Sequence, residues 1–296
     1  MKILRENLTP EEYEKFNLQE CLDILYYVDG ITIDDLFDSL IITEEEVKQL
    51  KANVELVERE TIEKIYNYCY NHNIFINDIL WIQEKENLPK SNILLAHGSR
   101  FNIKGNIRLD ASGDSNDFAN GFYCGENLKQ AGMFVSGEPE SSLYIVSLDP
   151  TDLKAARFNV STNWMLAVAY YRETIDEYKN HPRIKNIISK IEECDYIIAP
   201  IADNRMFQII DAFIGGEITD AQCKYALSAT NLGFQYVFKN KKALEHLSVL
   251  NHLYLCKAEK NRYNIFNQEE SNTSLNKAII ARKKFTNVGN YIQDIL

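Results

Sequence analysis

The stretch that decides the fold runs from Asn92 to Phe134 and begins with Ile93-Leu94-Leu95-Ala96-His97-Gly98-Ser99-Arg100. Its four leading apolar residues predict a fully buried strand, because such a strand lacks the alternation of a strand with one exposed face. A histidine and a glycine follow at the end of this strand. Since glycine has no Cβ, a ligand is able to approach its backbone closely. The stretch therefore predicts a buried strand with a binding position at its carboxyl end.

A second short strand is predicted at Asp117-Phe118-Ala119-Asn120-Gly121-Phe122-Tyr123-Cys124, and Phe134 follows eleven positions after Tyr123. A helix over 126–131 is expected to bring Phe134 beside the same pocket. Alternation and β-branching predict three further strands, at 143–148, 194–200 and 234–238. The strand at 234–238 is the last clear one. Helical patterns are found at 150–177, 205–213 and 220–229.

Taken in this order, the motifs resemble those of ADP-ribosyltransferases of the diphtheria-toxin and poly(ADP-ribose) polymerase type. That family binds NAD with His-Gly-(Ser/Thr) on one strand, Gly-(Ile/Phe)-Tyr on a second, and an aromatic residue eleven positions later. Within the superfamily the chain looks most like the bacterial group called domain of unknown function 3990. Three phrases carry this likeness: the 117–123 motif, Ala199-Pro200-Ile201-Ala202-Asp203-Asn204-Arg205, and Gly233-Phe234-Gln235-Tyr236-Val237-Phe238. The resemblance covers roughly 92–255.

The resemblance assigns roles to the first strand. His97 is expected to hydrogen-bond the ribose hydroxyls of NAD, and the backbone of Gly98 to hold the nicotinamide carboxamide. Ser99 would also reach that amide. Arg100 is expected to meet either the pyrophosphate or a nearby carboxylate. These groups would grip a substrate whose glycosidic bond breaks with oxocarbenium-like charge.

The second strand supplies the aromatic residues of the expected site. Tyr123 and Phe134 would sandwich the nicotinamide ring, and the hydroxyl of Tyr123 is also able to donate a hydrogen bond. Phe122 belongs to the same cofactor-binding motif. The alternative is that these aromatic side chains are core residues, since the chain holds 17 Tyr and 14 Phe.

At the third position of the site the sequence departs from the polymerase pattern. The family places there, at the start of a late strand, a glutamate that binds the ribose 2′-hydroxyl. Aligning 234–238 with that strand puts Gln235 at this position. Glutamine hydrogen-bonds a hydroxyl but carries no charge and cannot act as a base. The resemblance then implies a mono-ADP-ribosyltransferase with His97, Tyr123 and Gln235 as catalytic residues, or an NAD-binding relic.

Charge divides the chain in two. Residues 1–90 carry 9 Lys and Arg against 20 Asp and Glu, which accounts for the whole net charge of −11, and Gly30 is the only glycine before Gly98. Residues 18–77 show a helical pattern throughout, with Thr32 and Thr43 as expected N-caps. The polar, Pro-containing segment 79–92 is expected to be a link.

This helical segment resembles the small helix-turn-helix domain of phage-repressor type. DNA binding would follow, but the third helix begins with Glu44-Glu45-Glu46, where base edges and phosphates would lie. Contact with a partner protein, or a role as a packing platform, are the alternatives.

We therefore expect an α+β chain: a helical domain at 1–90, a split-β-sheet ADP-ribosyltransferase-like domain at 91–256, and a polar extension at 257–296 with a basic helix near Arg282. NAD is the expected co-substrate, and the acceptor, protein or nucleic acid, is left open. The scattered cysteines predict no metal site and a reducing, cytoplasmic compartment. No apolar run has the length of a membrane span. The resemblance suggests a bacterial toxin, effector or phage-defence component, possessing transferase activity. The other functions left open are NAD hydrolysis and a non-enzymatic regulator.

Overall fold

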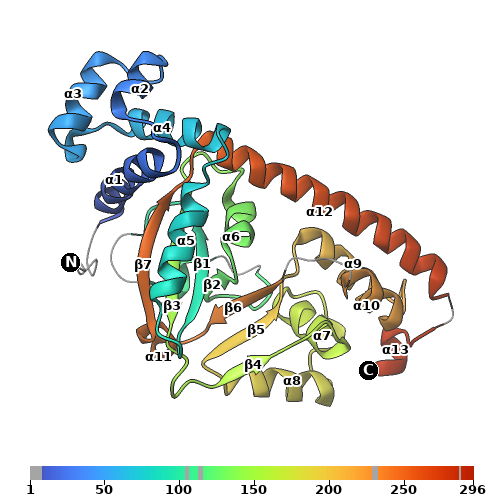
Figure 1. Ribbon diagram of the computed structural model, residues 1–296. Coiled ribbons are helices and arrows are strands. Elements are labelled where there is room, and N and C mark those ends of the chain that lie inside the picture. Colours follow the sequence, from blue (N-terminus) through green and yellow to red (C-terminus); the bar gives the residue numbers. More distant parts are fainter. Residues whose placement is uncertain (1–8, 104–106, 113–115, 229–232, 287) are drawn as a thin grey trace. The chain divides into compact units, whose positions relative to one another are not determined.

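A computed structural model describes residues 9–103, 107–112, 116–228, 233–286 and 288–296. The chain forms two compact units that are interleaved along the sequence. Unit 1 comprises Met1–Asn106, Asn127–Leu148 and Ser248–Asn264, and unit 2 comprises Ile107–Glu126, Asp149–Leu247 and Ile265–Leu296. Both contain helices and strands, so the chain is a mixed α/β protein (Figure 1). No helix among the described residues has the length and apolar character that crossing a membrane requires.

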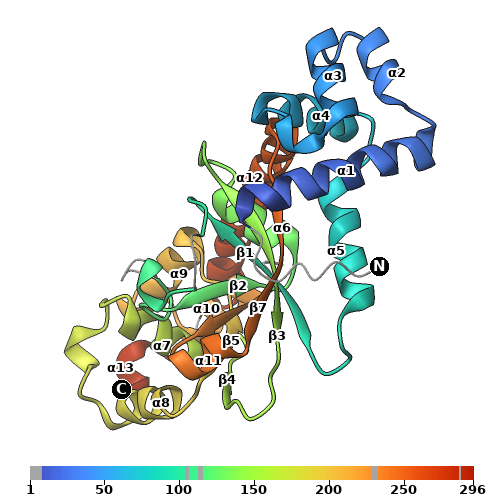
Figure 2. The same cartoon turned by 90° about the vertical axis from the view of Figure 1, so that its left-hand side faces the viewer.

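Unit 1 begins with five helices: α1 (Pro10–Asp29), α2 (Ile33–Asp38), α3 (Glu44–Ala52), α4 (Arg59–Asn71) and α5 (Ile76–Asn87). Figure 2 shows α2, α3 and α4 gathered along α1. The predicted caps are confirmed, because Thr32 and Thr43 each form a capping box with the acidic residue three positions later. The segment expected to be a link, 79–92, is helical over most of its length, since α5 continues to Asn87.

Three strands complete unit 1, in the order β1 (Ile93–Ser99), β3 (Ser142–Leu148) and β7 (Leu247–Tyr254). β1 and β3 are antiparallel, and the helix α6 (Leu128–Val135) precedes β3. β7 corrects the expectation that 234–238 is the last strand. Its polar residues are buried by the helices: the Nδ2 atom of Asn17 in α1 donates to Oδ1 of Asn251 at 2.9 Å and to the carbonyl of His252 at 2.8 Å.

Unit 2 holds four strands in the order β4 (Ala155–Arg157), β5 (Tyr196–Pro200), β6 (Phe234–Phe238) and β2 (Phe122–Gly125). β4 and β5 are parallel, while the β5–β6 and β6–β2 pairs are antiparallel. β4 corrects the prediction that 150–177 is helical, because only α7 (Thr162–Tyr171) and a short 3-10 turn within that range are helices. The other helices are α8 (Pro182–Glu192), α9 (Asn204–Ile214), α10 (Asp220–Ser228), α11 (Lys241–Glu245) and α13 (Ile292–Ile295).

The core of unit 2 is built around α7. Every residue from Trp164 to Ala169 is fully buried, so this helix is apolar on all faces. Phe118, Phe213 and Val237 lie in the same cluster. Because β5 and β6 are buried beside it, the side chains that they carry are held firmly in place.

The last long helix, α12, runs over Lys257–Lys284. The basic helix expected near Arg282 is therefore only the end of a much longer element. Glu259, in the first turn of α12, is buried in unit 1. Its carboxylate accepts hydrogen bonds from Nδ2 of Asn77 at 2.6 Å and from the hydroxyl of Tyr263 at 3.0 Å. Burial nevertheless outweighs these donors and raises the pKa of Glu259 from 4.5 to about 8.

This raised pKa predicts that stability falls with rising pH. Between pH 4.5 and about 8 the folded chain binds the proton of Glu259 while the unfolded chain has lost it. The stabilisation is therefore complete below the unfolded pKa and is lost as pH rises toward the folded pKa, with a slope of up to ~1.4 kcal/mol per pH unit. We expect Glu259→Gln, which is isosteric and neutral, to remove this slope in urea unfolding measured from pH 5 to 8.5.

The matched control is Glu86→Gln, since Glu86 lies in the same unit and is exposed. Its unfolding should keep the wild-type pH dependence. An unchanged slope in Glu259→Gln would contradict the assignment of the effect to this carboxyl group.

Candidate functional site

The residues predicted to form the site fall into two groups. His97, Gly98, Ser99, Arg100 and Phe134 lie in unit 1, whereas Phe122, Tyr123 and Gln235 lie in unit 2.

In unit 1 the strand β1 carries His97 to its carboxyl end. The register places His97 opposite Tyr144 of β3, with the ring centroids 6.2 Å apart. The imidazole is half-buried. The hydroxyl of Ser99 donates to the carbonyl of Phe101 at 2.6 Å, so it closes a local turn. His97 is thus fixed by the strand pair.

Gly98 is required by packing. A Cβ at this position would lie 2.4 Å from the carbonyl oxygen of Ala131 and 3.0 Å from Cγ1 of Val135, both in α6. The backbone of Gly98 was expected to be approached closely by a ligand, but in the structure it is α6 that lies against it. The same contact brings α6, and with it Phe134, next to the end of β1.

Phe134 and Arg100 form the exposed part of this group. The Phe134 ring is 67% exposed, which is unusual for a phenylalanine. The guanidinium carbon of Arg100 lies 6.0 Å from the centroid of that ring, and its Nε atom lies 3.2 Å from Oε1 of Glu138. Of the two partners expected for Arg100, a pyrophosphate or a nearby carboxylate, the structure shows the carboxylate, which is that of Glu138. An open aromatic face beside a cation suits a planar, partly anionic ligand.

In unit 2 the strand register brings Tyr123 and Gln235 onto one face. Tyr123 pairs with Val237 and Gly125 pairs with Gln235 in the β2–β6 ladder. Side chains of paired residues share a face, and so do those two positions apart on one strand. Tyr123 and Gln235 are therefore diagonal neighbours, whereas the Phe122 ring is buried 6.4 Å from that of Phe238.

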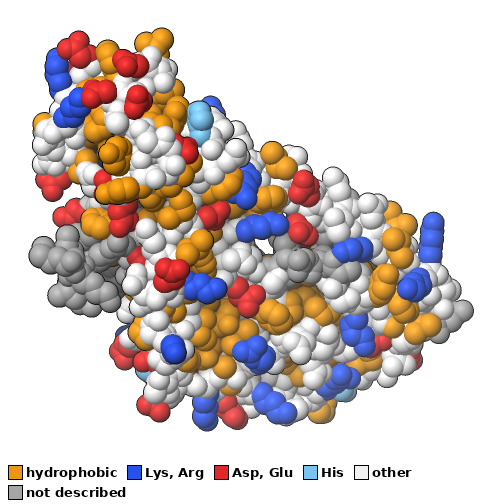
Figure 3. All heavy atoms as spheres, in the orientation of Figure 1, with side chains coloured by type: hydrophobic (Ala, Val, Ile, Leu, Met, Phe, Trp, Pro, Cys, Tyr) orange, Lys and Arg blue, Asp and Glu red, His pale blue; other side chains and the backbone are white. Residues whose placement is uncertain are grey.

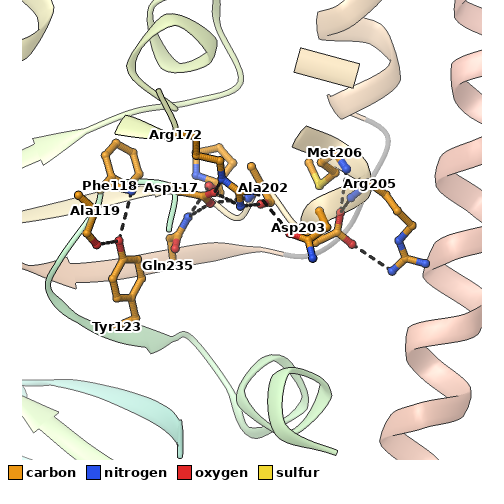
Figure 4. Close-up of polar contacts among 12 residues, drawn as sticks. Asp117, Phe118, Ala119, Tyr123, Arg172, Ala202, Asp203, Arg205, Met206 and Gln235 are labelled. Atoms are coloured by element: carbon orange, nitrogen blue, oxygen red, sulfur yellow. Dashed lines mark hydrogen bonds and ion pairs between the residues drawn. The ribbon is translucent and has the colours of Figure 1, made fainter. Parts of the chain in front are cut away.

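The hydroxyl of Tyr123 holds the loop that precedes β2. It donates to the carbonyl of Ala119 at 2.6 Å and accepts from the amide of Phe118 at 3.2 Å (Figure 4). Ala119 has φ 54°, a left-handed conformation that few non-glycine residues adopt. Lys239 Nζ pins the same loop by donating to the carbonyls of Phe118 and Asn120, each at 2.6 Å. Burial raises the pKa of Tyr123, so its hydroxyl stays protonated.

A buried polar network surrounds Gln235, and sequence reasoning missed most of it. The Asp117 carboxylate receives Nε and Nη2 of Arg172 on Oδ1, at 3.0 and 2.6 Å. Its Oδ2 atom receives the amide of Ala202 at 2.8 Å and Nε2 of Gln235 at 2.7 Å (Figure 4). Nε2 of Gln235 also donates to the carbonyl of Pro200 at 3.1 Å.

The charge balance of this network is set by Arg172, at the end of α7. Its guanidinium donates to the carbonyl of Ala202 at 2.7 Å and lies 4.4 Å from the Phe207 ring centroid. Burial raises the pKa of Asp117, whereas Arg172, the Ala202 amide and Gln235 act in the opposite direction. Asp117 is thus the centre of a network that joins the segment before β2 to the loop after β5.

Asp203 and Arg205 form an ion pair at 3.1 Å where the loop after β5 meets α9. Asp203 also caps α9 by accepting from the amides of Arg205 and Met206. This part of the 199–205 phrase therefore has a structural role, next to the carbonyl and amide groups that meet Arg172 and Asp117.

A comparison with family models places the chain. The model of the family described as "Protein of unknown function (DUF3990)" matches residues 93–249, more than half of the sequence. This mixed α/β chain therefore belongs to that family. No curated protein and no solved structure matches it.

Proposed function

We propose that the chain transfers one ADP-ribose from NAD to a macromolecular acceptor and releases nicotinamide. The fold assigned to residues 91–256 would then be the split sheet of ADP-ribosyltransferases. The observation that carries the proposal is the β2–β6 register, which puts Tyr123 and Gln235 on one face. The resemblance requires this pairing of an aromatic residue and a ribose-binding residue on neighbouring strands.

Each residue of the proposed site would have a separate part in the reaction. Phe134, with its exposed ring, and Tyr123 would stack on the nicotinamide. His97 would orient the ribose, and Gln235 would hydrogen-bond its 2′-hydroxyl. The bond between ribose and nicotinamide breaks, nicotinamide leaves with the bonding electrons, and a nucleophile of the acceptor forms the new bond to the same carbon. The orientation of the ribose affects the rate, because a small displacement of the reacting atoms slows the reaction greatly.

The test uses NAD labelled in its adenine part, incubated with the full chain and a cell lysate. The proposal expects label on macromolecules together with nicotinamide release, and neither product from His97→Ala. Nicotinamide release without attached label would replace transfer by hydrolysis. Failure of the wild-type chain to consume NAD would reject both activities.

One set of observations favours a second candidate, a non-enzymatic regulator. The hydroxyls of Ser99 and Tyr123 and the Nε2 atom of Gln235 are all bonded within the protein. A domain that binds NAD without cleaving it would need fewer side-chain groups available to hydrogen-bond the substrate. The labelled-NAD experiment separates the two, because binding without nicotinamide release favours the regulator.

For the helical segment we propose protein contact. Figure 3 shows acidic side chains over the surface formed by α2 and α3. Glu46, at the start of α3, accepts from the hydroxyl of Thr61 at 2.7 Å and from Nζ of Lys64 at 2.9 Å. Although burial opposes them, these bonds lower its pKa to about 2. A helix that begins with fixed negative charge repels phosphates, which disfavours a DNA-binding role for the segment.

A further inference from the structure

The side-chain amide of Gln235 has a defined orientation. Its Nε2 atom has two hydrogens, and both point at acceptors: Oδ2 of Asp117 at 2.7 Å and the carbonyl of Pro200 at 3.1 Å. Neither partner is able to donate when Asp117 is ionised, so the nitrogen and oxygen of the amide cannot exchange places. Among the described residues, none donates a hydrogen bond to the remaining atom, Oε1.

Burial raises the pKa of Asp117, but the hydrogen-bond donors around the carboxylate favour its ionised form. Its two oxygens meet four N–H groups, contributed by Arg172, the Ala202 amide and Gln235. A proton on either oxygen would face one of these donors. The position of Gln235 is fixed as well, because it pairs with Gly125 on one side and with Ala199 on the other.

We propose that Asp117, held by Arg172, is a positioning residue that makes Gln235 an acceptor-only group for a substrate hydroxyl. This inference rests on the function proposed above and specifies the polarity of its site. A ribose hydroxyl, which donates, satisfies Oε1. A phosphate or carbonyl oxygen, which accepts, does not. The fixed amide oxygen thus takes over the hydrogen-bonding part of the carboxylate expected in this position.

Two isosteric substitutions change the network in opposite ways. In Asp117→Asn the amide oxygen faces Arg172, because the guanidinium supplies only donors. The new NH2 group then meets Nε2 of Gln235, and the Gln235 amide must flip and present a donor to the ligand. In Gln235→Glu two carboxylates lie about as close as the 2.7 Å contact of the wild type, so the pair retains a proton.

The double variant Asp117→Asn with Gln235→Glu exchanges the two chemical groups. The new amide at position 117 would donate to the new carboxylate at position 235, and the network again contains a single carboxylate. The other oxygen of that carboxylate then faces the ligand as an acceptor. We therefore expect the double variant to regain part of what each single variant loses, because the carboxylate at position 235 cannot donate to the carbonyl of Pro200.

The experiment measures kcat and KM for NAD, and for an NAD analogue that lacks the 2′-hydroxyl of the nicotinamide ribose, in the full chain and the three variants. The wild type should prefer NAD by at least about tenfold, because its acceptor is left unpaired by the analogue. Asp117→Asn should lose roughly 10- to 100-fold in kcat/KM for NAD and most of this preference, and the double variant should recover part of both. Wild-type kcat/KM and preference in Asp117→Asn would overturn the positioning role.

A urea-unfolding cycle on the same variants needs no NAD and separates the two claims. The midpoint of the double variant should exceed the value that the two single changes predict when added. Strict additivity overturns the Asp117–Gln235 coupling, whatever the NAD assay gives. No NAD consumption by the wild type, with non-additive midpoints, overturns the proposed function and leaves the coupling in place.

Discussion

Arg172→Met should lower the free energy of unfolding by about 3 to 5 kcal/mol, because it leaves the Asp117 carboxylate buried without its cation. The side chains of Asp117 and Arg172 are only 5% and 13% exposed, and their closest contact is 2.6 Å. Water cannot replace the guanidinium at this site. Urea unfolding of the full chain at neutral pH measures the loss, and part of it should return when Asp117→Asn is added.

Arg108→Met is the matched control, since Arg108 and Asp110 form a similar pair in unit 2 at 2.7 Å. Their side chains are 71% and 67% exposed, so water solvates either charge when the other is removed. The cost of this change should stay within about 0.5 kcal/mol. If the two substitutions lowered the free energy of unfolding equally, burial of the Asp117–Arg172 pair would make no difference to its contribution to stability.

His97→Ala should reduce kcat/KM for NAD by about 100-fold or more, because the ribose that His97 is proposed to orient would be displaced from its reactive position. The half-buried imidazole lies at the end of β1, and its loss should cost only about 1 kcal/mol of stability. Nicotinamide release, measured beside urea unfolding, distinguishes lost chemistry from lost folding.

His72→Ala serves as the control for that substitution. His72 is an exposed histidine at the end of α4, and its Nδ1 atom contacts the carbonyl of Tyr68 in the same helix. Its removal should leave nicotinamide release unchanged. If both variants release nicotinamide at the wild-type rate, His97 has no catalytic role.

The strands that sequence predicted are those whose residues are apolar along most of their length. β1, β3, β5 and β6 lie where expected, because a continuous apolar run indicates a buried segment. The strand expected at 117–124 is shorter than predicted, since β2 begins only at Phe122 and the residues before it form the loop held by Tyr123. β7 was not predicted, because Asn251 and His252 interrupt its apolar pattern. Both are fully buried, and Asn251 is satisfied by Asn17, 234 positions away. No local pattern contains that partner.

The polar network of the site was missed for the same reason. Asp117 and Gln235 were both noted, but the residue that joins them to a positive charge is Arg172, 55 positions after Asp117. Its place at the end of the apolar helix α7 gave no sign of a partner. By contrast, the pair of Asp203 and Arg205 lies within one local motif, since two positions separate the residues. The domain limits 1–90, 91–256 and 257–296 stay a prediction.

The central claim is that one NAD molecule engages both His97 and Tyr123. The most direct measurement is a titration of NAD into the full chain, followed through the side-chain NMR signals of these two residues and assigned with His97→Asn and Tyr123→Phe. The account predicts that both signals shift with one common Kd, at or below roughly millimolar NAD. A shift of only one signal, or of neither, would contradict it.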